Sequence, residues 1–144
     1  MIKIRTAKKS DIKDISSLFI EVSLTDIHKS DKNALKKYLS YVIKSRKFIV
    51  LVAEENSKIL GFCISQLGVP MPDCADVVDI NVSKKAQGKG IGQKLMAELY
   101  KRLKKKKIKN LGVYSENIPK TIKFYEKQGF KRGRTVIRFD KKLT

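Results

Sequence analysis

Two carboxylates on an apolar run, followed by a glycine-rich turn, form the chemically richest part of this sequence. Asp76 and Asp79 lie in the β-rich run at residues 75–82, where a carboxylate can accept a proton from a substrate. If the two carboxylates share one neighbourhood, the pKa of one of them rises toward neutrality. The turn carries three glycines and opens into an amphipathic helix, whose unpaired N–H groups and positive dipole end attract anions. The segment therefore predicts an anion-binding turn directly after a strand that carries two carboxylates.

Two familiar phosphate-binding motifs do not fit this turn. A P-loop needs a second glycine five positions after the first, but Gly88 leads to Gln93 and Gly90 leads to Leu95. The dinucleotide fingerprint G-x-G-x-x-G also fails, because it requires glycine at position 93. The turn therefore belongs to neither of these nucleotide-binding classes.

Strands and helices along the whole chain are expected to position this segment. Ser10 is a predicted helix N-cap, Pro119 is expected in the first turn of the last helix, and Gly129 is expected to end it. Residues 54–57 have the composition of a hairpin turn. Strands are predicted at residues 2–5, 48–53, 59–66, 75–82 and 111–114, with one or two more at 130–140; helical periodicity covers residues 12–22, 35–43 and 91–103. This order indicates a mixed sheet flanked by helices.

Two sequence blocks carry a resemblance to a known family. Residues 87–92 fit the pattern Q/R-x-x-G-x-G, and residues 117–130 contain Asn117 followed by F-Y-x-x-x-G-F. With both blocks suitably spaced, the chain resembles the GNAT superfamily of acetyl-CoA-dependent N-acetyltransferases over nearly its whole length. One departure is Lys120, where the family usually has a small alanine. The resemblance implies an α/β (α+β) fold with a mixed, mostly antiparallel central sheet flanked by helices, in one domain spanning residues 1–144.

The resemblance also implies a reaction, the direct attack of a primary amine on the thioester of acetyl-CoA. The acceptor is left open as a protein or a small molecule. Tyr125 occupies the family's general-acid position, although a tyrosine at helical spacing also fits a core residue. Asp79 is favoured over Asp76 as the proton acceptor, and either carboxylate also fits a solvated strand-end or loop position.

The cofactor contacts implied by the resemblance are mostly backbone groups. Residues 80–82 would pair with the pantetheine arm like an added strand, and the glycine-rich turn at residues 87–92 would wrap the pyrophosphate. Asn117 would contact the pantetheine arm or position the helix of Tyr125, and it also fits a helix N-cap before Pro119. No metal site is expected. The implied cofactor-binding residues are Ile80, Asn81, Val82, Gln87, Gly88, Lys89, Gly90, Ile91, Gly92, Asn117 and Tyr125.

The charge of the chain leaves a different class of function open. The 144 residues include 33 Lys and Arg against 14 Asp and Glu, a formal net charge of +19. A basic nucleic-acid-binding module, acting through the lysine-rich residues 101–109, or a non-catalytic acyl-CoA-binding module is the alternative. Nucleic-acid binding is disfavoured because only six of the basic residues are Arg and no aromatic residues are interleaved with the lysines.

Several remaining features bear on location and partners. The longest uninterrupted apolar run, residues 48–53, is far shorter than the ~20 residues of a membrane span, and no secretion signal begins the chain, so we expect a cytoplasmic monomer or homodimer. Cys63 and Cys74 are expected to be reduced, inert thiols, and His28 is expected to have no role. Acidic residues at positions 21, 26 and 31 are candidates for making an acceptor pocket locally acidic.

Overall fold

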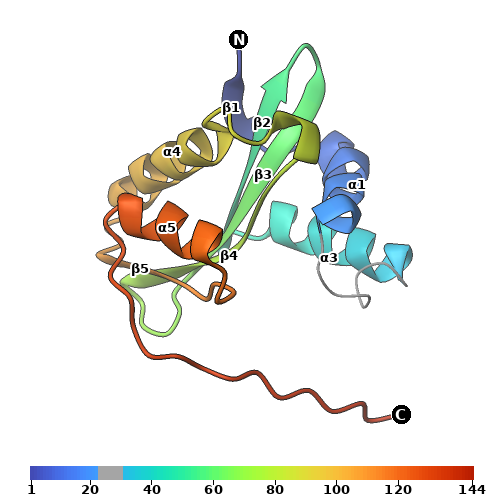
Figure 1. The fold of residues 1–144 in the computed structure, drawn as a ribbon. Helices are drawn as coiled ribbons and strands as arrows, with labels where there is room; N and C mark the ends of the chain where they lie inside the picture. Colours follow the sequence, from blue (N-terminus) through green and yellow to red (C-terminus); the bar gives the residue numbers. More distant parts are fainter. Residues whose placement is uncertain (23–30) are drawn as a thin grey trace. The chain divides into compact units, whose positions relative to one another are not determined.

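The computed structural model describes residues 1–22 and 31–144, which fold into two compact units, Met1–Val113 and Tyr114–Thr144 (Figure 1). The prediction of a single domain stays a prediction. In the first unit lie β1 (Lys3–Thr6), a 3-10 turn (Lys9–Asp11), α1 (Ile12–Val22), α3 (Lys32–Lys44), β2 (Phe48–Glu55), β3 (Lys58–Leu67), β4 (Cys74–Val82), a second 3-10 turn (Lys84–Ala86), α4 (Ile91–Lys105) and β5 (Asn110–Val113). The second unit contains α5 (Pro119–Lys127).

The five strands form one sheet in the order β1-β2-β3-β4-β5. The first three pairings are antiparallel, and β4 pairs with β5 in parallel. The predicted mixed, mostly antiparallel sheet is therefore confirmed. The predicted hairpin is also present, because Asn56 and Ser57 join β2 to β3 with the positive φ angles that a tight turn requires.

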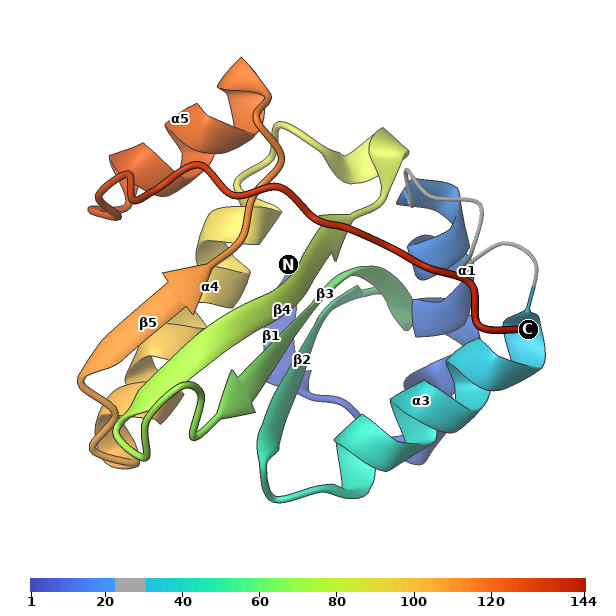
Figure 2. The same ribbon diagram turned by 90° about the horizontal axis from the view of Figure 1, so that it is seen from below.

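Helices cover both faces of this sheet, with α1 and α3 on one face and α4 on the other (Figures 1 and 2). The core on the α1 and α3 face includes Phe19 and Phe62, whose rings stack with their centroids 5.6 Å apart. On the opposite face, Ile91 and Leu95 of α4 approach Gly61 so closely that a Cβ there would lie 3.4 Å from each side chain. Burial of apolar side chains on both faces thus fixes the sheet between its helices.

An ion-pair network ties β1 to the start of α1 and to β2. Both terminal nitrogens of Arg5 contact the Asp11 carboxylate, at 2.7 and 2.9 Å, and Nη2 also contacts Glu54 at 2.9 Å. Asp11 Oδ2 accepts the backbone N–H of Lys8 at 2.7 Å as well. The predicted N-cap Ser10 lies inside the 3-10 turn, and Asp11 accepts the N–H of Lys8, the residue that begins this turn.

The predicted strands at residues 130–140 are not formed, and this prediction is wrong. Residues 130–144 contain no helix or strand, although Val136, Ile137 and Phe139 are exposed apolar side chains of the type found in strands. A strand requires a partner strand for its backbone groups, and the regular element within the unit Tyr114–Thr144 is the helix α5, whose backbone groups bond to one another. Gly129 does end α5, with a φ of +89°.

Candidate functional site

A β-bulge in β4 decides where its carboxylates point. Opposite β3, Ile64 pairs with Asp79 whereas the next residue, Ser65, pairs with Val77, so Val78 is an extra residue. A bulge shifts the alternation of side chains by one position. Residues that are three apart in a regular strand face opposite sides of the sheet, but across this bulge they face the same side.

Both carboxylates therefore lie on one face of the sheet. Positions 62, 64 and 66 of β3 alternate onto the α1 and α3 face, and their partners on β4 are Asn81, Asp79 and Asp76. Because opposed residues on paired strands project to the same side, these three polar side chains share that face. All three residues were named as candidates from the sequence. The bulge that brings their side chains to one face was not predicted.

Asp79 is half-buried, and burial raises the pKa of its carboxyl to about 6. The hydrogen bond from Asn81 Nδ2 to Asp79 Oδ1, at 2.7 Å, lowers this pKa and so opposes burial. The prediction that the pKa of one of the two carboxyls rises toward neutrality is therefore confirmed for Asp79, with burial as the cause. The Asp79 charge also raises the pKa of Tyr38 on α3, second to burial of that phenol. Tyr38 is a residue of the site that sequence reasoning missed.

Asp76 is turned toward the edge strand β5. A Cβ at Gly112, the partner of Asp76 on β5, would lie 2.8 Å from Asp76 Oδ1, so a larger residue there would require this carboxylate to turn aside. The backbone oxygen of Asp76 accepts the hydroxyl of the fully buried Ser65 at 2.9 Å. The Ser65 bond ties this part of β4 to β3 below the bulge.

One backbone edge of β4 is open beyond the bulge. The pairing of β4 with β5 ends at Val77 and Val113, whereas β4 continues to Val82. Figure 2 shows β4 running on past the end of β5. Within residues 1–22 and 31–113, β4 beyond Val77 pairs only with β3, and Val78 exposes 42% of its surface there. An extended molecule with amide groups can therefore hydrogen-bond along this edge.

The glycine-rich turn leaves the start of α4 uncapped. Gly88 and Gly90 have φ angles of +81° and +76°, a left-handed conformation that favours glycine. Gly90 is the N-cap and offers no side-chain hydrogen bond, and the first intrahelical bond runs from the N–H of Lys94 to its oxygen at 3.1 Å. The preceding N–H groups, at positions 91 to 93, point out of the helix start and can bind an anion.

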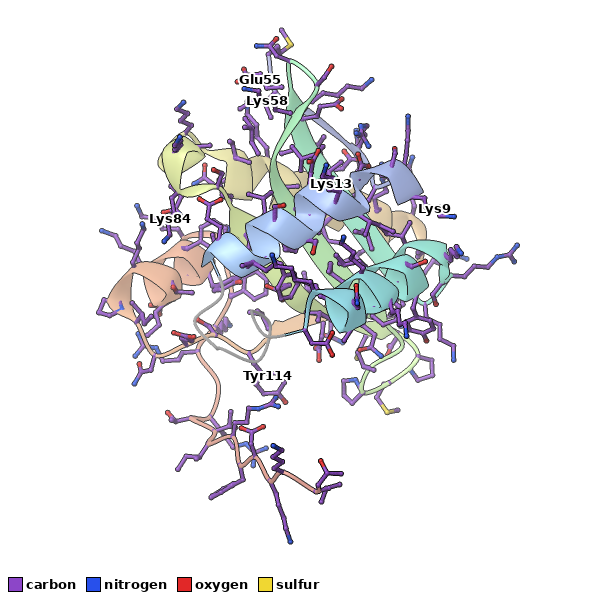
Figure 3. All side chains as sticks on the ribbon, turned by 90° about the vertical axis from the view of Figure 1, so that its right-hand side faces the viewer. Lys9, Lys13, Glu55, Lys58, Lys84 and Tyr114 are labelled. Atoms are coloured by element: carbon purple, nitrogen blue, oxygen red, sulfur yellow. The ribbon has the colours of Figure 1, made fainter. Side chains whose placement is uncertain are left out.

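Two contacts fix the beginning of this turn. Gln87 Nε2 donates to the backbone oxygen of Val82 at 3.1 Å, which returns the turn to the end of β4. The N–H of Lys84 donates to Glu21 Oε1 at 3.0 Å, and Figure 3 shows Lys84 beside the end of α1. The strand end, the turn and α1 are thus held together by polar contacts.

The acidic residues expected to serve an acceptor pocket have other roles where they are described. Glu21 accepts the N–H of Lys84, and Asp31 caps α3 by accepting the N–H of Ala34 at 2.9 Å. Asp26 and His28 lie outside the described residues. The carboxylates that the structure brings to the candidate site are instead those of β4.

In the second unit, Tyr125 belongs to an aromatic cluster. Its ring meets Phe124 and Phe130 edge-on, with centroids 5.1 and 5.4 Å away, and 8% of the residue is exposed. This packing agrees with the core interpretation, and the general-acid role stays a prediction. Asn117 is exposed and does not cap α5, whose N-cap is Ile118 without a side-chain bond. The N-cap interpretation of Asn117 is therefore wrong, and its cofactor contact stays a prediction.

Outside this region, the lysine-rich stretch at residues 101–109 is largely exposed, but Arg102 is committed to the fold. Its guanidinium contacts Glu98 at 2.9 Å and Thr6 Oγ1 at 2.6 Å. Over residues 1–22 and 31–144, no group of three or more His, Cys, Asp or Glu side chains is placed to hold a metal ion. None of the helices in that part of the chain has the length and apolarity needed to cross a membrane.

Comparison with known proteins gives a family match and a shared fold. Residues 46–132 match the model of the acetyltransferase (GNAT) domain. No curated protein matches the sequence. Among solved structures, AAC(6')-Iy in complex with the bisubstrate analogue CoA-S-monomethyl-acetylneamine has a TM-score of 0.84 at 15% identity, covering 99% of both chains.

Two further structures share the fold. The PaiA N-acetyltransferase from Thermoplasma acidophilum, in complex with coenzyme A, has a TM-score of 0.81 at 22% identity, over 94% of this chain and 93% of that chain. An integron cassette protein from the mobile metagenome of V. cholerae has a TM-score of 0.78 at 27% identity, over 97% and 93% of the two chains.

Proposed function

This chain belongs to the GNAT acetyltransferase family and is an acyltransferase, and from that membership we propose that it transfers the acetyl group of acetyl-CoA to a primary amine. The observation that carries the proposal is the combination of an open β4 edge with an uncapped glycine turn at its end. Two structural neighbours are complexes with coenzyme A or a coenzyme A analogue, which agrees with this cofactor.

The backbone groups and charges of this region suit coenzyme A. The N–H groups at the start of α4 suit a pyrophosphate, and the left-handed glycines let the backbone approach it without a Cβ. The open edge of β4 beyond Val77 suits the amide groups of a pantetheine arm. Exposed lysines surround the turn and attract an anion over a longer range: Lys84, Lys85, Lys89 and Lys94. When bound, acetyl-CoA supplies an activated acetyl thioester.

Asp79 is the proposed proton acceptor. A lysine-like amine is neutral only about once in 2,500 molecules at pH 7, so removing its proton is a substantial part of the barrier. With a pKa of about 6, the Asp79 carboxyl is mostly ionised at pH 7 and is still a better base than an ordinary aspartate. Its carboxylate would take the first proton from the ammonium group. The freed amine nitrogen would then bond to the acetyl carbon as the carbon–sulfur bond breaks, and the second proton of that nitrogen would pass to water, which leaves a neutral amide.

Tyr125 is the proposed proton donor to the leaving thiolate. Its phenol would give a proton to the sulfur, so that coenzyme A leaves as a neutral thiol. This role is supported by the family pattern around Tyr125, F-Y-x-x-x-G-F at residues 124–130. Asn117, in the same block, is proposed as a contact of the pantetheine arm.

The acceptor class is tested by a panel of amines: a diamine, an amino sugar and a peptide ending in lysine, assayed for acetyl-CoA-dependent release of coenzyme A. We expect at least one amine to release coenzyme A in a saturable manner. Binding of acetyl-CoA without turnover on any amine would favour the non-catalytic acyl-CoA-binding module. Weak, salt-sensitive affinity of equal size for coenzyme A and for any polyanion would favour nucleic-acid binding through residues 101–109.

The role of Tyr125 is tested with a matched tyrosine in the same unit. Tyr125→Phe should lower turnover by roughly 10- to 1,000-fold while acetyl-CoA affinity changes little, because only a hydroxyl is lost. Tyr114→Phe is the control, since Tyr114 is 81% exposed and should leave turnover unchanged. Wild-type turnover of Tyr125→Phe across the pH range would show that Tyr125 serves packing alone.

A further inference from the structure

We propose that Asn81 is a positioning residue whose side-chain amide holds Asp79 by one oxygen, Oδ1, so that the other oxygen, Oδ2, accepts the proton from the acceptor amine. The inference rests on the proposed function of Asp79 and adds a role for a side chain that the family resemblance engages only through its backbone. It is carried by the geometry of three neighbouring positions on β3 and β4.

The first step is the contact itself. Asn81 and Asp79 are two residues apart on one strand and face the same side, and Nδ2 lies 2.7 Å from Oδ1. An ionised carboxylate only accepts hydrogen bonds, so the amide must present its NH₂ group to Asp79. Within residues 1–22 and 31–113, Oδ2 of Asp79 receives no hydrogen bond. Among these residues, the carboxylate is thus held at one oxygen and open at the other.

The second step is that Asn81 is itself held in place. It pairs with Phe62, which is fully buried and stacks on Phe19. A Cβ at Gly61 would lie 2.9 Å from the Asn81 backbone oxygen, so the two strands approach as closely as a glycine permits. A side chain anchored on this backbone can orient a carboxylate with little freedom to move.

The third step is electrostatic. Burial raises the pKa of Asp79, and the bond from Asn81 acts in the opposite direction and favours the ionised form that can take a proton. The titratable neighbours that sense Asp79 are Tyr38 on α3 and Cys63 on β3, and burial raises the pKa of both, that of Cys63 to about 12. Both are therefore neutral near pH 7. On α1, Glu21 is engaged with the N–H of Lys84.

The test follows the titration of Asp79 directly, without needing the natural acceptor. In the full chain with ¹³C-labelled aspartate, the carboxyl resonance of Asp79 is assigned by its loss in Asp79→Asn and followed against pH. Asn81→Leu, which keeps the volume and removes the donor, should move the Asp79 midpoint upward by about one pH unit. Asn110→Leu is the matched control, because Asn110 pairs with Cys74, about 16 Å along β4 from Asp79, and should leave the midpoint unchanged.

Kinetics with the most active amine of the panel supply the second readout. In Asn81→Leu, the acidic limb of the kcat profile should move upward with the resonance, and KM for acetyl-CoA should stay near its wild-type value. Adding Asn81→Leu to Asp79→Asn should cause no further loss of turnover, because the amide acts through the carboxylate.

Each outcome separates the two proposals. If Asn81→Leu is folded by circular dichroism and the Asp79 midpoint does not move, the positioning role is wrong, whatever Asp79 does. If the midpoint moves but Asp79→Asn retains wild-type turnover and pH profile, the proton-acceptor role of Asp79 is wrong and Asn81 has nothing to position. Should Asn81→Leu fail to fold, Asn81→Ala, which also removes the donor, must move the Asp79 midpoint upward, and an unmoved midpoint in folded Asn81→Ala also overturns the role.

Discussion

Replacing Asp79 with asparagine should make the folded protein more stable at neutral and alkaline pH while impairing the proposed reaction. The pKa of this carboxyl rises from 3.8 to about 6 on folding, so ionising it in the folded state carries a free-energy cost. A shift of about two units corresponds to about 3 kcal/mol, and solvent screening of a half-buried group reduces this to about 1–2 kcal/mol. For a chain of this size, the variant should melt a few degrees higher, at about 3 °C per kcal/mol.

The sign follows from proton binding in the two states. Between about pH 4 and pH 6, the folded protein holds a proton on Asp79 that the unfolded chain has lost, so wild-type stability falls as pH rises through this window. Above about pH 7 the cost is complete and constant. Asp79→Asn has no such group, so the stability difference between the variant and the wild type should grow from pH 4 to pH 7 and then level off.

The assay is urea unfolding of the wild type and of Asp79→Asn at several pH values, with the free energies compared pair by pair. Contributions from other titrating groups cancel in this difference. If the stability difference between the two proteins does not change between pH 4 and pH 8, the raised pKa and the burial that causes it are refuted. The same conclusion follows if the wild type becomes more stable than Asp79→Asn as the pH rises from 4 to 8.

Three further substitutions test other parts of the structure. Gly90→Val should weaken coenzyme A binding about tenfold or more, measured by calorimetry. Gly68→Val, at a φ of +75° outside the turn, should bear similar backbone strain and bind coenzyme A normally. Equal binding by both variants would show that the turn is not the anion site. Gly112→Ala should lower the free energy of unfolding by about 1 kcal/mol through its contact with Asp76, and Asp76→Ala should relieve that loss in the double variant. Asp11→Asn should lower stability by about 1–2 kcal/mol at pH 7. Because the ion pair lowers the pKa of Asp11, this loss should begin to shrink in urea unfolding as the pH falls below the ordinary value of 3.8 and should vanish only below the lowered pKa of the folded state.

Most of the fold could be predicted from local patterns in the sequence. Apolar residues at helical or alternating spacing located the helices and the first five strands to within a few residues, because those periods reflect which face of an element is buried. The strand prediction at 130–140 failed for the opposite reason. Strand composition shows that a segment can pair, but the partner must be supplied by the rest of the structure.

The sequence by itself also determined the glycine turn and the run of β4 that precedes it, since left-handed backbone and helix starts depend on residues close together in the chain. Only the tertiary structure decided which polar side chains meet. The bulge at Val78 exists through pairing with β3, and it turns Asp76, Asp79 and Asn81 to one face. The pKa of Asp79 likewise depends on atoms packed around it from distant parts of the chain. Register and burial are non-local, and so the chemistry of these residues was settled only when the strands and helices came together.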